Sequence, residues 1–431
     1  MNLQSNDPHL DQGEQPPVDE KEAQYLRTLQ EASDYLKKGT PLYQREKTAT
    51  KGNGKNKFLK TKDPKVVRKK ILKILLILLA VVLAMVMIAS STFYILYRIG
   101  RNKMLSYEEF QPQFPQPGDI VETLPTEPVA GEQESETTEP DRILTYDDGK
   151  TVSYKGETYV LNENITTVLL IGVDRKELEA GTDRGAAGEA DCIMLLSMDA
   201  KTGETKIVNI SRESYAQVDI YSVSDAYIES KNTQICRAYA YGDGAELSCE
   251  NTVKSVRRIL YGMPIHTYVA LDMRFIGAAT DAVGGITVTA LSDVKMPDDR
   301  IVEKGTVIEL RGAEAERYVR YRDRTLLNSN LLRMERQKQY VALFVKKALS
   351  ETKRDLTTVM DLYKALSQYM TTDLSVADVT FLFSTFLNQG ATYEFSAIQG
   401  RLDRLDENAI YYLDETDIYE TVLDLYYTKV E

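Results

Sequence analysis

Histidine and cysteine are scarce in this chain of 431 residues, and both shortages limit the chemistry it can use. Its two histidines are His9, in the N-terminal tail, and His266, which follows Gly-Met-Pro at an expected turn. A Ser-His-Asp or Cys-His site would have to depend on His266 alone, and we interpret that residue as structural. A zinc site rich in histidine is disfavoured for the same reason. The chemistry must therefore use carboxylates, arginines or hydroxyls.

The three cysteines, Cys192, Cys236 and Cys249, fit no metal-binding spacing. Their odd number also gives no disulfide framework. We therefore favour three buried thiols, with a disulfide between Cys236 and Cys249 as the alternative.

Basic residues are fewer than acidic ones, 53 Lys and Arg against 65 Asp and Glu, so the formal net charge is −12. A nucleic-acid-binding domain needs a basic patch, so no nucleic-acid partner is expected. The sequence contains neither a Walker loop nor a Rossmann fingerprint, the usual motifs for nucleotides. An internal repeat of about 20–50 residues is absent as well. The length and composition suit one large domain or two ordinary ones with a substantial core.

A long apolar segment follows a basic N-terminal region. Residues 51–73 contain ten Lys or Arg and one acid, whereas residues 74–97 carry no charge. A helix rising about 1.5 Å per residue over 74–97 spans a bilayer. A buried core helix is the alternative, but the absence of a polar face argues against it. Only three basic residues follow between 98 and 103, so residues 1–73 are expected to be a flexible basic tail in the cytoplasm.

Residues 98–143 are expected to form a disordered spacer rich in Pro, Glu and Thr. Six of the 13 prolines of the chain lie between residues 108 and 141. Such a composition cannot bury enough apolar surface to offset the entropy of ordering. The sequence therefore predicts a single-pass protein of the cell membrane whose domain at 144–431 lies outside the cytoplasm.

Strands alternate with helices after residue 143, which predicts a layered α/β or α+β domain around a buried sheet. Strands are expected within 143–161, which reads as two short hairpins, and at 166–174, 191–200, 205–214, 266–273 and 284–291. Helices are expected at 245–260, 274–283, 312–321, 330–350, 356–370 and, as the last helix of the domain, within 407–429.

Two acids and an arginine fall at strand ends. Asp174 follows one expected strand, Asp191 begins the next, and Arg212 closes a third. Ligand crevices of layered α/β domains lie at such strand ends. Carboxylates hold Mg²⁺ together with phosphate oxygens, and the arginine fork matches phosphate geometry. The pattern favours a site for a divalent metal and an anion, with a strand-end cap or a surface ion pair as the alternative for each residue alone.

Residues 319–339 contain five arginines, at positions 320, 322, 324, 333 and 336. Arg320 and Arg322 project to the same side if the chain there is extended. Arg333 and Gln337 are four residues apart, so they share one helical face. These four side chains are expected to form a cradle for a pyrophosphate.

Asn330 is expected to cap the helix that carries Arg333 and Gln337, which places Arg333 in its first turn. A helix N-terminus favours an anion, so it adds to this cradle. Arg324 and Arg336 are interpreted as salt-bridge partners. The alternative for the whole stretch is a solvated, ion-paired surface.

Seven motifs in order resemble the LytR-CpsA-Psr (LCP) family over about residues 165–390. They are "VLLIGVD", "ADCIMLLSMDAKTGETKIVNISRESY", "RAYAYGDGAEL", "GMPIHTYVALDM", "DAVGGITV", "RYVRYR" and "RMERQKQ". The resemblance implies an α-β-α domain with a central mixed sheet, preceded by one transmembrane helix, in a Gram-positive bacterium. It further implies transfer of a polyprenyl-pyrophosphate-linked glycopolymer, such as wall teichoic acid or capsule, onto peptidoglycan through a phosphodiester, with the lipid in an apolar tunnel.

The same resemblance implies roles for the residues already named. Asp174 and Asp191 would bind Mg²⁺ or Mn²⁺, and either acid is open as general base. The pyrophosphate would be bound by Arg212, Arg320, Arg322, Arg333 and Gln337, and the catalytic set would be Asp174, Asp191 and Arg212.

This chain departs from the usual family pattern at four positions: Glu189, Glu213, Gln234 and Asn330. Glu189 stands where the family usually has arginine, and Arg184 is a candidate substitute. The departures favour an altered donor or acceptor, and reduced or lost transferase activity is the alternative. A lipid-pyrophosphate hydrolase and a non-catalytic regulator of envelope assembly are the other functions left open.

Overall fold

The computed structural model describes residues 64–107, 110–114, 144–181, 183–323, 325, 329–354, 358–389, 392–405 and 408–430. The chain divides into two compact units, Met1–Leu76 and Ile77–Glu431, and the architecture below is that of the second. Most of the expected tail, at 1–63, and the spacer residues 115–143 lie outside the described residues, as does Arg324.

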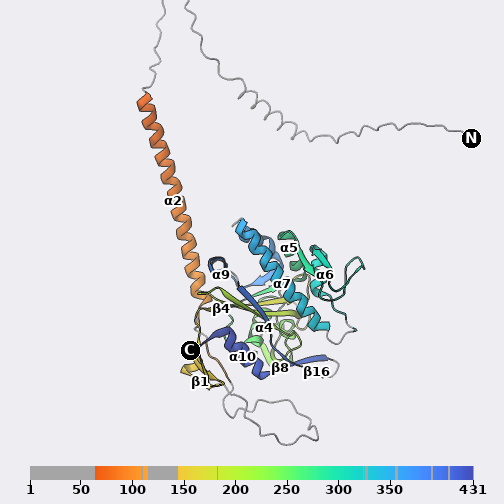
Figure 1. Cartoon of the computed structure of the whole chain (residues 1–431). Coiled ribbons are helices and arrows are strands. Elements are labelled where there is room, and N and C mark those ends of the chain that lie inside the picture. Colours follow the sequence, from red (N-terminus) through yellow and green to blue (C-terminus); the bar gives the residue numbers. More distant parts are fainter. Residues whose placement is uncertain are drawn as a thin grey trace, which may run out of the picture. The chain divides into compact units, whose positions relative to one another are not determined.

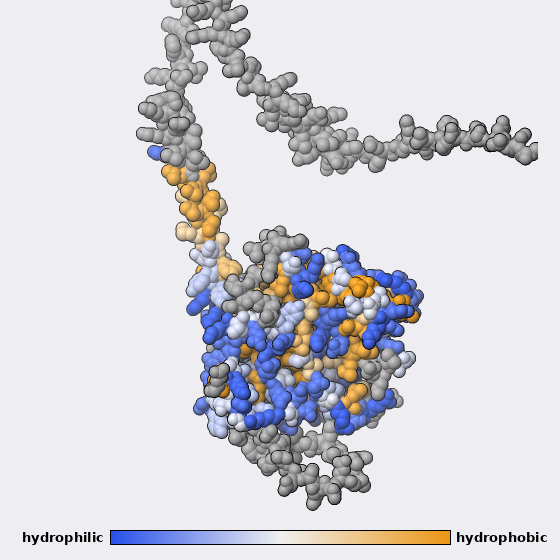
Figure 2. All heavy atoms as spheres, in the orientation of Figure 1, coloured by the Kyte–Doolittle hydropathy of each residue, from blue (hydrophilic) through white to orange (hydrophobic). Residues whose placement is uncertain are grey.

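Helix α2 (Pro64–Met104) contains the apolar segment. Its part from Leu76 to Met104 is long and apolar enough to cross a membrane, and the most apolar stretch of this part is not buried against the rest of the protein. Figure 2 shows hydrophobic residues around the exposed middle of this helix. The expected helix at 74–97 is therefore longer at both ends.

The structure places residues 98–107 and 110–114, which the sequence assigns to the spacer, partly against the domain. Gly100 lies so close to α9 (Val376–Gln389) that a Cβ there would be 2.1 Å from the Ala377 carbonyl oxygen, so only glycine permits this approach. Lys103 Nζ lies 3.0 Å from the buried carboxylate of Asp378. Phe114 belongs to the main hydrophobic core. The end of α2 is thus attached to the domain directly.

The two hairpins expected after residue 143 are confirmed as part of a small sheet. Strands β1 (Leu144–Tyr146), β2 (Thr151–Tyr154) and β3 (Glu157–Leu161) pair in antiparallel order, and β18 (Tyr427–Lys429) adds to the edge at β3. The last strand of the domain thereby returns to its start.

The central sheet is mixed and has six strands in the order β14-β9-β4-β5-β6-β15. The strands are β4 (Ile165–Val173), β5 (Ala190–Asp199), β6 (Glu204–Ile210), β9 (Thr267–Leu271), β14 (Met370–Thr372) and β15 (Thr392–Ala397). β4 pairs antiparallel with β5 and parallel with β9, and β15 joins β6 in parallel. The expected α/β fold with a central mixed sheet is confirmed.

Helices cover the two faces of this sheet (Figure 1), with α5, α6 and α7 on one side and α4 and α10 on the other. The helices of the domain are α3 (Arg237–Ala240), α4 (Glu246–Ile259), α5 (Met273–Ala282), α6 (Gly312–Arg320), α7 (Ser329–Arg354), α8 (Thr358–Leu366), α9 (Val376–Gln389) and α10 (Glu415–Tyr426). The helices expected at 245–260, 274–283, 312–321, 330–350 and 356–370 are therefore present.

The two faces of the central sheet differ in burial. Leu169 and Ile171 of β4 are fully buried in the core that includes residues of α4 and α10. Their neighbours Val168 and Leu170 point to the opposite face and are only half-buried, as is Leu196 of β5. Helices packed on both faces of a sheet normally bury both, but here they cover the second face incompletely around these three apolar side chains.

Four two-stranded antiparallel sheets complete the part of the fold that the structure describes. They are β7 (Tyr215–Tyr221) with β8 (Tyr227–Gln234), β10 (Ile286–Thr289) with β13 (Val307–Leu310), β11 (Val294–Lys295) with β12 (Ile301–Val302), and β16 (Gly400–Leu405) with β17 (Asn408–Leu413). The expectation of one helix within 407–429 is wrong in part. The helix that the structure has in this segment, α10, is shorter than expected. The Asp414 side chain caps it, and β17 and β18 flank it.

Candidate functional site: an arginine-lined cleft at the strand ends

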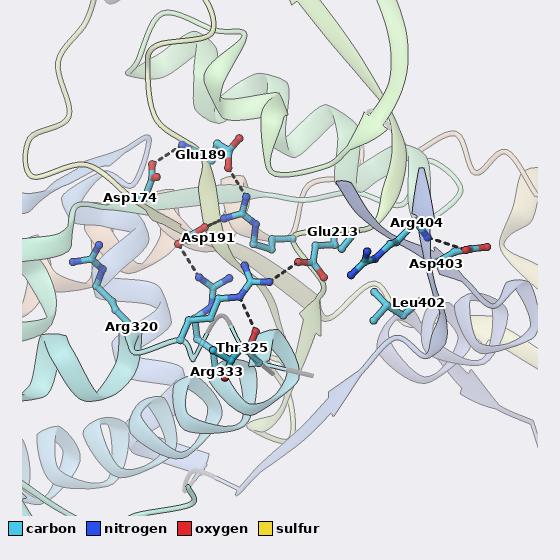
Figure 3. A pocket seen from close by; sticks show the side chains of 14 residues that line it. Asp174, Glu189, Asp191, Glu213, Arg320, Thr325, Arg333, Leu402, Asp403 and Arg404 are labelled. Atoms are coloured by element: carbon cyan, nitrogen blue, oxygen red, sulfur yellow. Dashed lines mark hydrogen bonds and ion pairs between the residues drawn. The ribbon is translucent and has the colours of Figure 1, made fainter. Parts of the chain in front are cut away.

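One cleft of about 1010 Å³ brings together six of the seven residues expected at the site. Its lining includes Asp174, Asp191, Arg212, Arg320, Arg322 and Arg333. Figure 3 shows Asp174 and Asp191 at the strand ends, on the opposite side of the cleft from Arg320 at the end of α6 and Arg333 of α7. Gln337 is absent from this lining. It is buried in α7, and its Oε1 accepts no hydrogen bond from the described part of the chain.

Arg212 and Asp191 meet because β5 and β6 are antiparallel neighbours. Ile193, near the start of β5, pairs with Ile210 at the end of β6, so the residues flanking these positions face each other. Arg212 Nη1 donates to Asp191 Oδ1, and its Nη2 donates to Glu189 Oε2. The guanidinium is thus held between two carboxylates at the edge of the cleft.

Asp174 follows β4 and faces the residues that precede β5. Its Oδ1 accepts a 2.7 Å hydrogen bond from the backbone N–H of Glu189. Gly188 makes this approach possible, because its φ is +93° and a Cβ there would lie 2.9 Å from Asp174 Oδ1. The second oxygen, Oδ2, accepts no hydrogen bond from any residue that the structure describes. Asp174 therefore offers one unengaged carboxylate oxygen to the cleft.

Arg333 is a buried cation whose hydrogen bonds are incomplete. Its Nη1 donates to Asp191 Oδ2 at 2.9 Å and its Nη2 to Asn330 Oδ1 at 2.8 Å, but Nε has no partner among the described residues. Burial lowers the pKa of Arg333 to about 10, and the charges of Arg212 and Arg322 act in the same direction. The side chain stays protonated at neutral pH, in surroundings where an added anion would be favourable.

Arg322 and Arg320 complete the positive side of the cleft. Arg322 donates from Nε to Ser329 Oγ at 3.0 Å and pairs through Nη2 with Glu213 Oε1 at 3.3 Å. Arg320 is the last residue of α6 and pairs with Glu316 at 2.6 Å. The expected extended segment is therefore wrong at Arg320, which is helical, but both arginines still line the cleft.

Two expectations for the arginine stretch are wrong. Arg336 is buried and donates to the carbonyl oxygens of Tyr318 and Tyr321 and to Ser292 Oγ, and it forms no salt bridge with any residue that the structure describes. Asn330 is not a helix cap, because α7 begins at Ser329. The Asn330 amide instead accepts from Arg333 and lies 3.4 Å from Glu213 Oε2.

Like Asn330, the three other residues that depart from the family pattern make contacts in or next to the cleft. Glu189 binds Arg212, Glu213 binds Arg322, and the Gln234 amide donates to the Ala409 carbonyl at 2.7 Å. Arg184 is no substitute for a cleft residue, because it donates to the carbonyl oxygens of Ser222 and Gly242 and does not line the cleft.

Cys192, Cys236 and Cys249 are free thiols, as expected. Cys236 and Cys249 are buried, whereas Cys192 is half-buried rather than buried. Cys236 Sγ accepts a hydrogen bond from Arg212 Nη2 at 3.3 Å. His266 Nδ1 accepts from the Thr167 backbone N–H at 3.1 Å. His266 does not line the cleft, in agreement with a structural role.

The cleft offers a divalent cation two carboxylates rather than a complete protein cage. Within the described residues there is no group of three or more His, Cys, Asp or Glu side chains suited to a metal. Mg²⁺ typically takes one or two carboxylates and fills its remaining positions with water and substrate phosphate oxygens. Asp174 and Asp191 fit that donor set, provided that Asp191 exchanges its arginine partners when an anionic ligand arrives.

Comparison with known proteins decides the family. The sequence profile of the LytR-CpsA-Psr family (LytR_cpsA_psr) matches residues 130–425, more than half of the chain. The chain belongs to the LytR-CpsA-Psr family.

Two relatives with curated names match the LCP chain over most of their own lengths. It is 26% identical over 266 residues to the polyisoprenyl-teichoic acid–peptidoglycan teichoic acid transferase TagU of Bacillus licheniformis, covering 61% of this chain and 78% of the relative. It is 24% identical over 259 residues to TagU of Bacillus subtilis, covering 60% and 76%. Among solved structures, protein gbs0355 of Streptococcus agalactiae superposes with a TM-score of 0.51 at 19% identity, covering 61% of this chain and 86% of that one, and supports the fold.

Proposed function

We propose that this LCP protein is a phosphotransferase that joins a polyprenyl-pyrophosphate-linked glycopolymer to peptidoglycan. The observation that carries the proposal is the cluster of Arg212, Arg322 and Arg333 beside Asp174 and Asp191 in one cleft. A buried, incompletely bonded arginine next to two further cations suits a dense anion such as pyrophosphate. The family relationship and the TagU relatives support the same reaction class.

The donor is proposed to be a lipid. The apolar helix Leu76–Met104 suits a protein held at the membrane where polyprenyl carriers reside. The half-buried face of the sheet, with Val168, Leu170 and Leu196 in the middle of β4 and β5, offers apolar surface for a polyprenyl chain. We propose that residues 1–73 are cytoplasmic and that the domain lies outside the cell, as the charge asymmetry around the helix indicates.

Binding of the pyrophosphate would rearrange the ion pairs of the cleft. In the free protein, Asp191 accepts from Arg212 and Arg333, and Glu213 accepts from Arg322. The phosphate oxygens compete for the same guanidinium donors and carry higher charge. The arginines would transfer to the pyrophosphate and leave the Asp191 carboxylate free. The acids thus hold the arginines in place before the substrate binds.

The reaction would be an in-line displacement at the glycan-side phosphorus. An acceptor hydroxyl of peptidoglycan attacks, a new P–O bond forms, and the bond to the polyprenyl phosphate breaks. The hydroxyl proton passes to Asp174, whose Oδ2 is unengaged in the free protein. Arg212 and Arg333 stabilise the charge that develops on the phosphoryl oxygens and on the leaving phosphate.

Magnesium or manganese is the proposed cofactor. Bound by Asp174 and Asp191, it would supply Lewis-acid stabilisation of phosphate charge. Wall teichoic acid is the proposed glycopolymer, because the two named relatives are teichoic acid transferases.

The test uses the full chain in detergent micelles with a synthetic polyprenyl-pyrophosphate disaccharide, with and without a peptidoglycan oligomer. A transferase forms a conjugate only when the oligomer is present. Release of the glycan phosphate by water alone would identify a hydrolase, and binding without turnover under either condition would identify a sensor of lipid carriers.

A further inference from the structure

The β16–β17 hairpin forms one side of the cleft although it is separate from the central sheet. β16 pairs only with β17, and all six of its residues are exposed. Leu402, Asp403, Arg404 and Ala409 of this hairpin line the same cleft as the arginines and acids. An exposed hairpin at the edge of a charged cleft is available to a ligand larger than a pyrophosphate.

Three contacts hold the hairpin against β7 and β8. The Tyr411 N–H donates to the Glu213 carbonyl at 2.8 Å, and the Gln234 amide donates to the Ala409 carbonyl at 2.7 Å. The rings of Tyr215 and Tyr412 pack with centroids 5.4 Å apart. Because Glu213 also binds Arg322 through its carboxylate, one residue connects the hairpin to the arginine cluster. The hairpin is therefore fixed relative to the pyrophosphate-binding residues.

Arg404 presents an unpaired cation to the cleft. Leu402 and Arg404 lie two residues apart on a strand and so share one face, which Figure 3 shows turned to the cleft, while Asp403 points away. Within the described part of the chain, the Arg404 guanidinium makes no hydrogen bond or ion pair. By contrast, Arg322 and Arg333 each contact a carboxylate, and Arg401, on the other face, lies 3.2 Å from Asp403.

The cleft is also larger than the pyrophosphate requires. Its volume of about 1010 Å³ is at the upper end of the range of about 300–1,000 Å³ for pockets that enclose drug-sized ligands. A pyrophosphate held by Arg212, Arg322 and Arg333 leaves the part next to the hairpin for the sugar chain. Arg404 is the cation that the chain meets there.

We propose that Leu402 and Arg404 form an outer subsite that binds a second phosphate, one carried by the glycan chain beyond its pyrophosphate. The proposal rests on the proposed function, because it assumes that the pyrophosphate occupies the arginine cluster. The Arg404 fork binds the phosphate oxygens, and the exposed Leu402 side chain contacts the adjacent backbone of the glycan. The protein thereby favours a donor whose repeating units carry phosphodiesters.

The experiment compares three synthetic donors bound to the full chain in detergent micelles. All three share a polyprenyl-pyrophosphate disaccharide. One ends there, one is extended by two glycerol phosphate units, and one by uncharged units of equal length. Affinities are measured for the parent, Arg404→Ala, Arg404→Gln and the matched control Arg401→Ala, which removes a cation from the opposite face of the same strand.

The expected result is a loss of about threefold to fivefold in affinity for the phosphate-extended donor in both Arg404 variants, the upper part of the range for one exposed charge pair. Affinity for the other two donors should stay within about twofold of the parent. Arg401→Ala should match the parent with all three. Equal losses for all donors would overturn the subsite, and so would equal losses in the Arg401 and Arg404 variants or no loss at all.

A peptidoglycan oligomer added to the assay tests the competing occupant. Loss of acceptor affinity in Arg404→Ala, with donor affinities unchanged, would show that the hairpin binds the acceptor and would overturn the proposal. Failure of the proposed function looks different. The parent would then transfer none of the three donors, while the binding measurements would still report whether Arg404 distinguishes them.

Discussion

Arg333 of α7 donates a 2.9 Å hydrogen bond to Asp191 of β5, although 142 residues separate the two in sequence. This contact joins the arginine stretch to the acids at the strand ends. The guanidinium and the carboxylate therefore each have an oppositely charged partner before any ligand is present. A bound anion must replace Asp191 as the partner of Arg333, and this exchange is what mutations at the two positions report.

Replacing Arg333 by lysine should weaken binding of a polyprenyl pyrophosphate by about 10- to 100-fold. Lysine keeps the charge but loses the planar fork, and a hydrogen bond to a charged group contributes about 1.5–3 kcal/mol. Arg322→Lys should show a smaller loss of the same kind, because that side chain is more exposed. Affinity is measured by isothermal titration calorimetry.

Arg317→Lys is the matched control for these variants. Arg317 is an exposed residue of α6 that does not line the cleft. Its replacement should leave affinity within about twofold, as expected for a surface cation. Equal behaviour at positions 317, 322 and 333 would mean that the arginines form a solvated charged surface, and the cradle would be wrong.

Asp174→Asn and Asp191→Asn should both lose the dependence of pyrophosphate binding on Mg²⁺, since each removes a proposed metal ligand. They should differ in the absence of metal. Asp191→Asn removes the carboxylate that competes for Arg212 and Arg333, so its metal-free affinity should rise by about threefold or more. Asp174 contacts no arginine in the described residues, so its variant should change less.

Calorimetric titrations with and without Mg²⁺ check both statements, and melting temperatures verify folding. Retention of the parental metal response by both variants would reject the metal site. A fall in metal-free affinity for Asp191→Asn would show that the carboxylate supports the anion site rather than competing with the ligand.

Arg336→Leu should destabilise the domain rather than weaken binding selectively. The guanidinium is buried and donates to Tyr318 O, Tyr321 O and Ser292 Oγ, which leucine would leave unsatisfied. Unsatisfied buried acceptors cost about 1–3 kcal/mol each, so the loss should be about 3 kcal/mol or more. Chemical unfolding measures it, with the exposed Arg317→Leu expected to change stability by less than about 1 kcal/mol. A stable Arg336→Leu protein would contradict the structural role.

His266 should make the domain less stable as the pH falls from about 6.5 to about 4. Burial lowers the pKa of His266 to about 4, against 6.5 for an unperturbed histidine. The unfolded state therefore binds the proton first, and the native state loses stability as the pH falls through this window. Protonation would place a hydrogen on Nδ1, where the Thr167 N–H now donates.

The measurement compares the free energy of unfolding at pH 7 and pH 4.5 for the parent and His266→Asn. The parent should lose about 2 kcal/mol more than the variant over this interval. Carboxylates titrate in both proteins and cancel in the comparison. An identical pH dependence would show that His266 is accessible to protons in the folded state.

Local sequence pattern predicted the elements that carry the site, but not all of the contacts within it. The sequence could place three site residues at strand ends, because a buried strand appears as a run of apolar residues followed by a charged one. They are Asp174, Asp191 and Arg212. Arg333 could be placed on a helix from the surrounding periodicity. Which acid each arginine contacts depends on the order of strands in the sheet, and no local pattern encodes that order.

The errors have the same origin. Arg336 looks like a surface cation in sequence, and only the tertiary fold brings three acceptors around it. The sequence predicts one helix for the segment at 407–429, whereas its first part, Asn408–Leu413, forms β17 by pairing with β16. The run of one β-branched and two aromatic residues at Ile410, Tyr411 and Tyr412 is the available signal for a strand. Missing that strand also concealed the hairpin that lines the cleft.

The most direct test of the central claim is a single-turnover experiment that follows phosphorus. The full chain is mixed with a donor carrying labelled pyrophosphate and with a peptidoglycan oligomer, and the products are resolved by mass spectrometry. Attack on the glycan-side phosphorus predicts polyprenyl monophosphate and a phosphodiester-linked conjugate in equal amounts, with the rate reduced at least about tenfold in Arg333→Lys. Release of polyprenyl pyrophosphate with a conjugate that lacks phosphorus would mean glycosyl transfer, and would contradict the account.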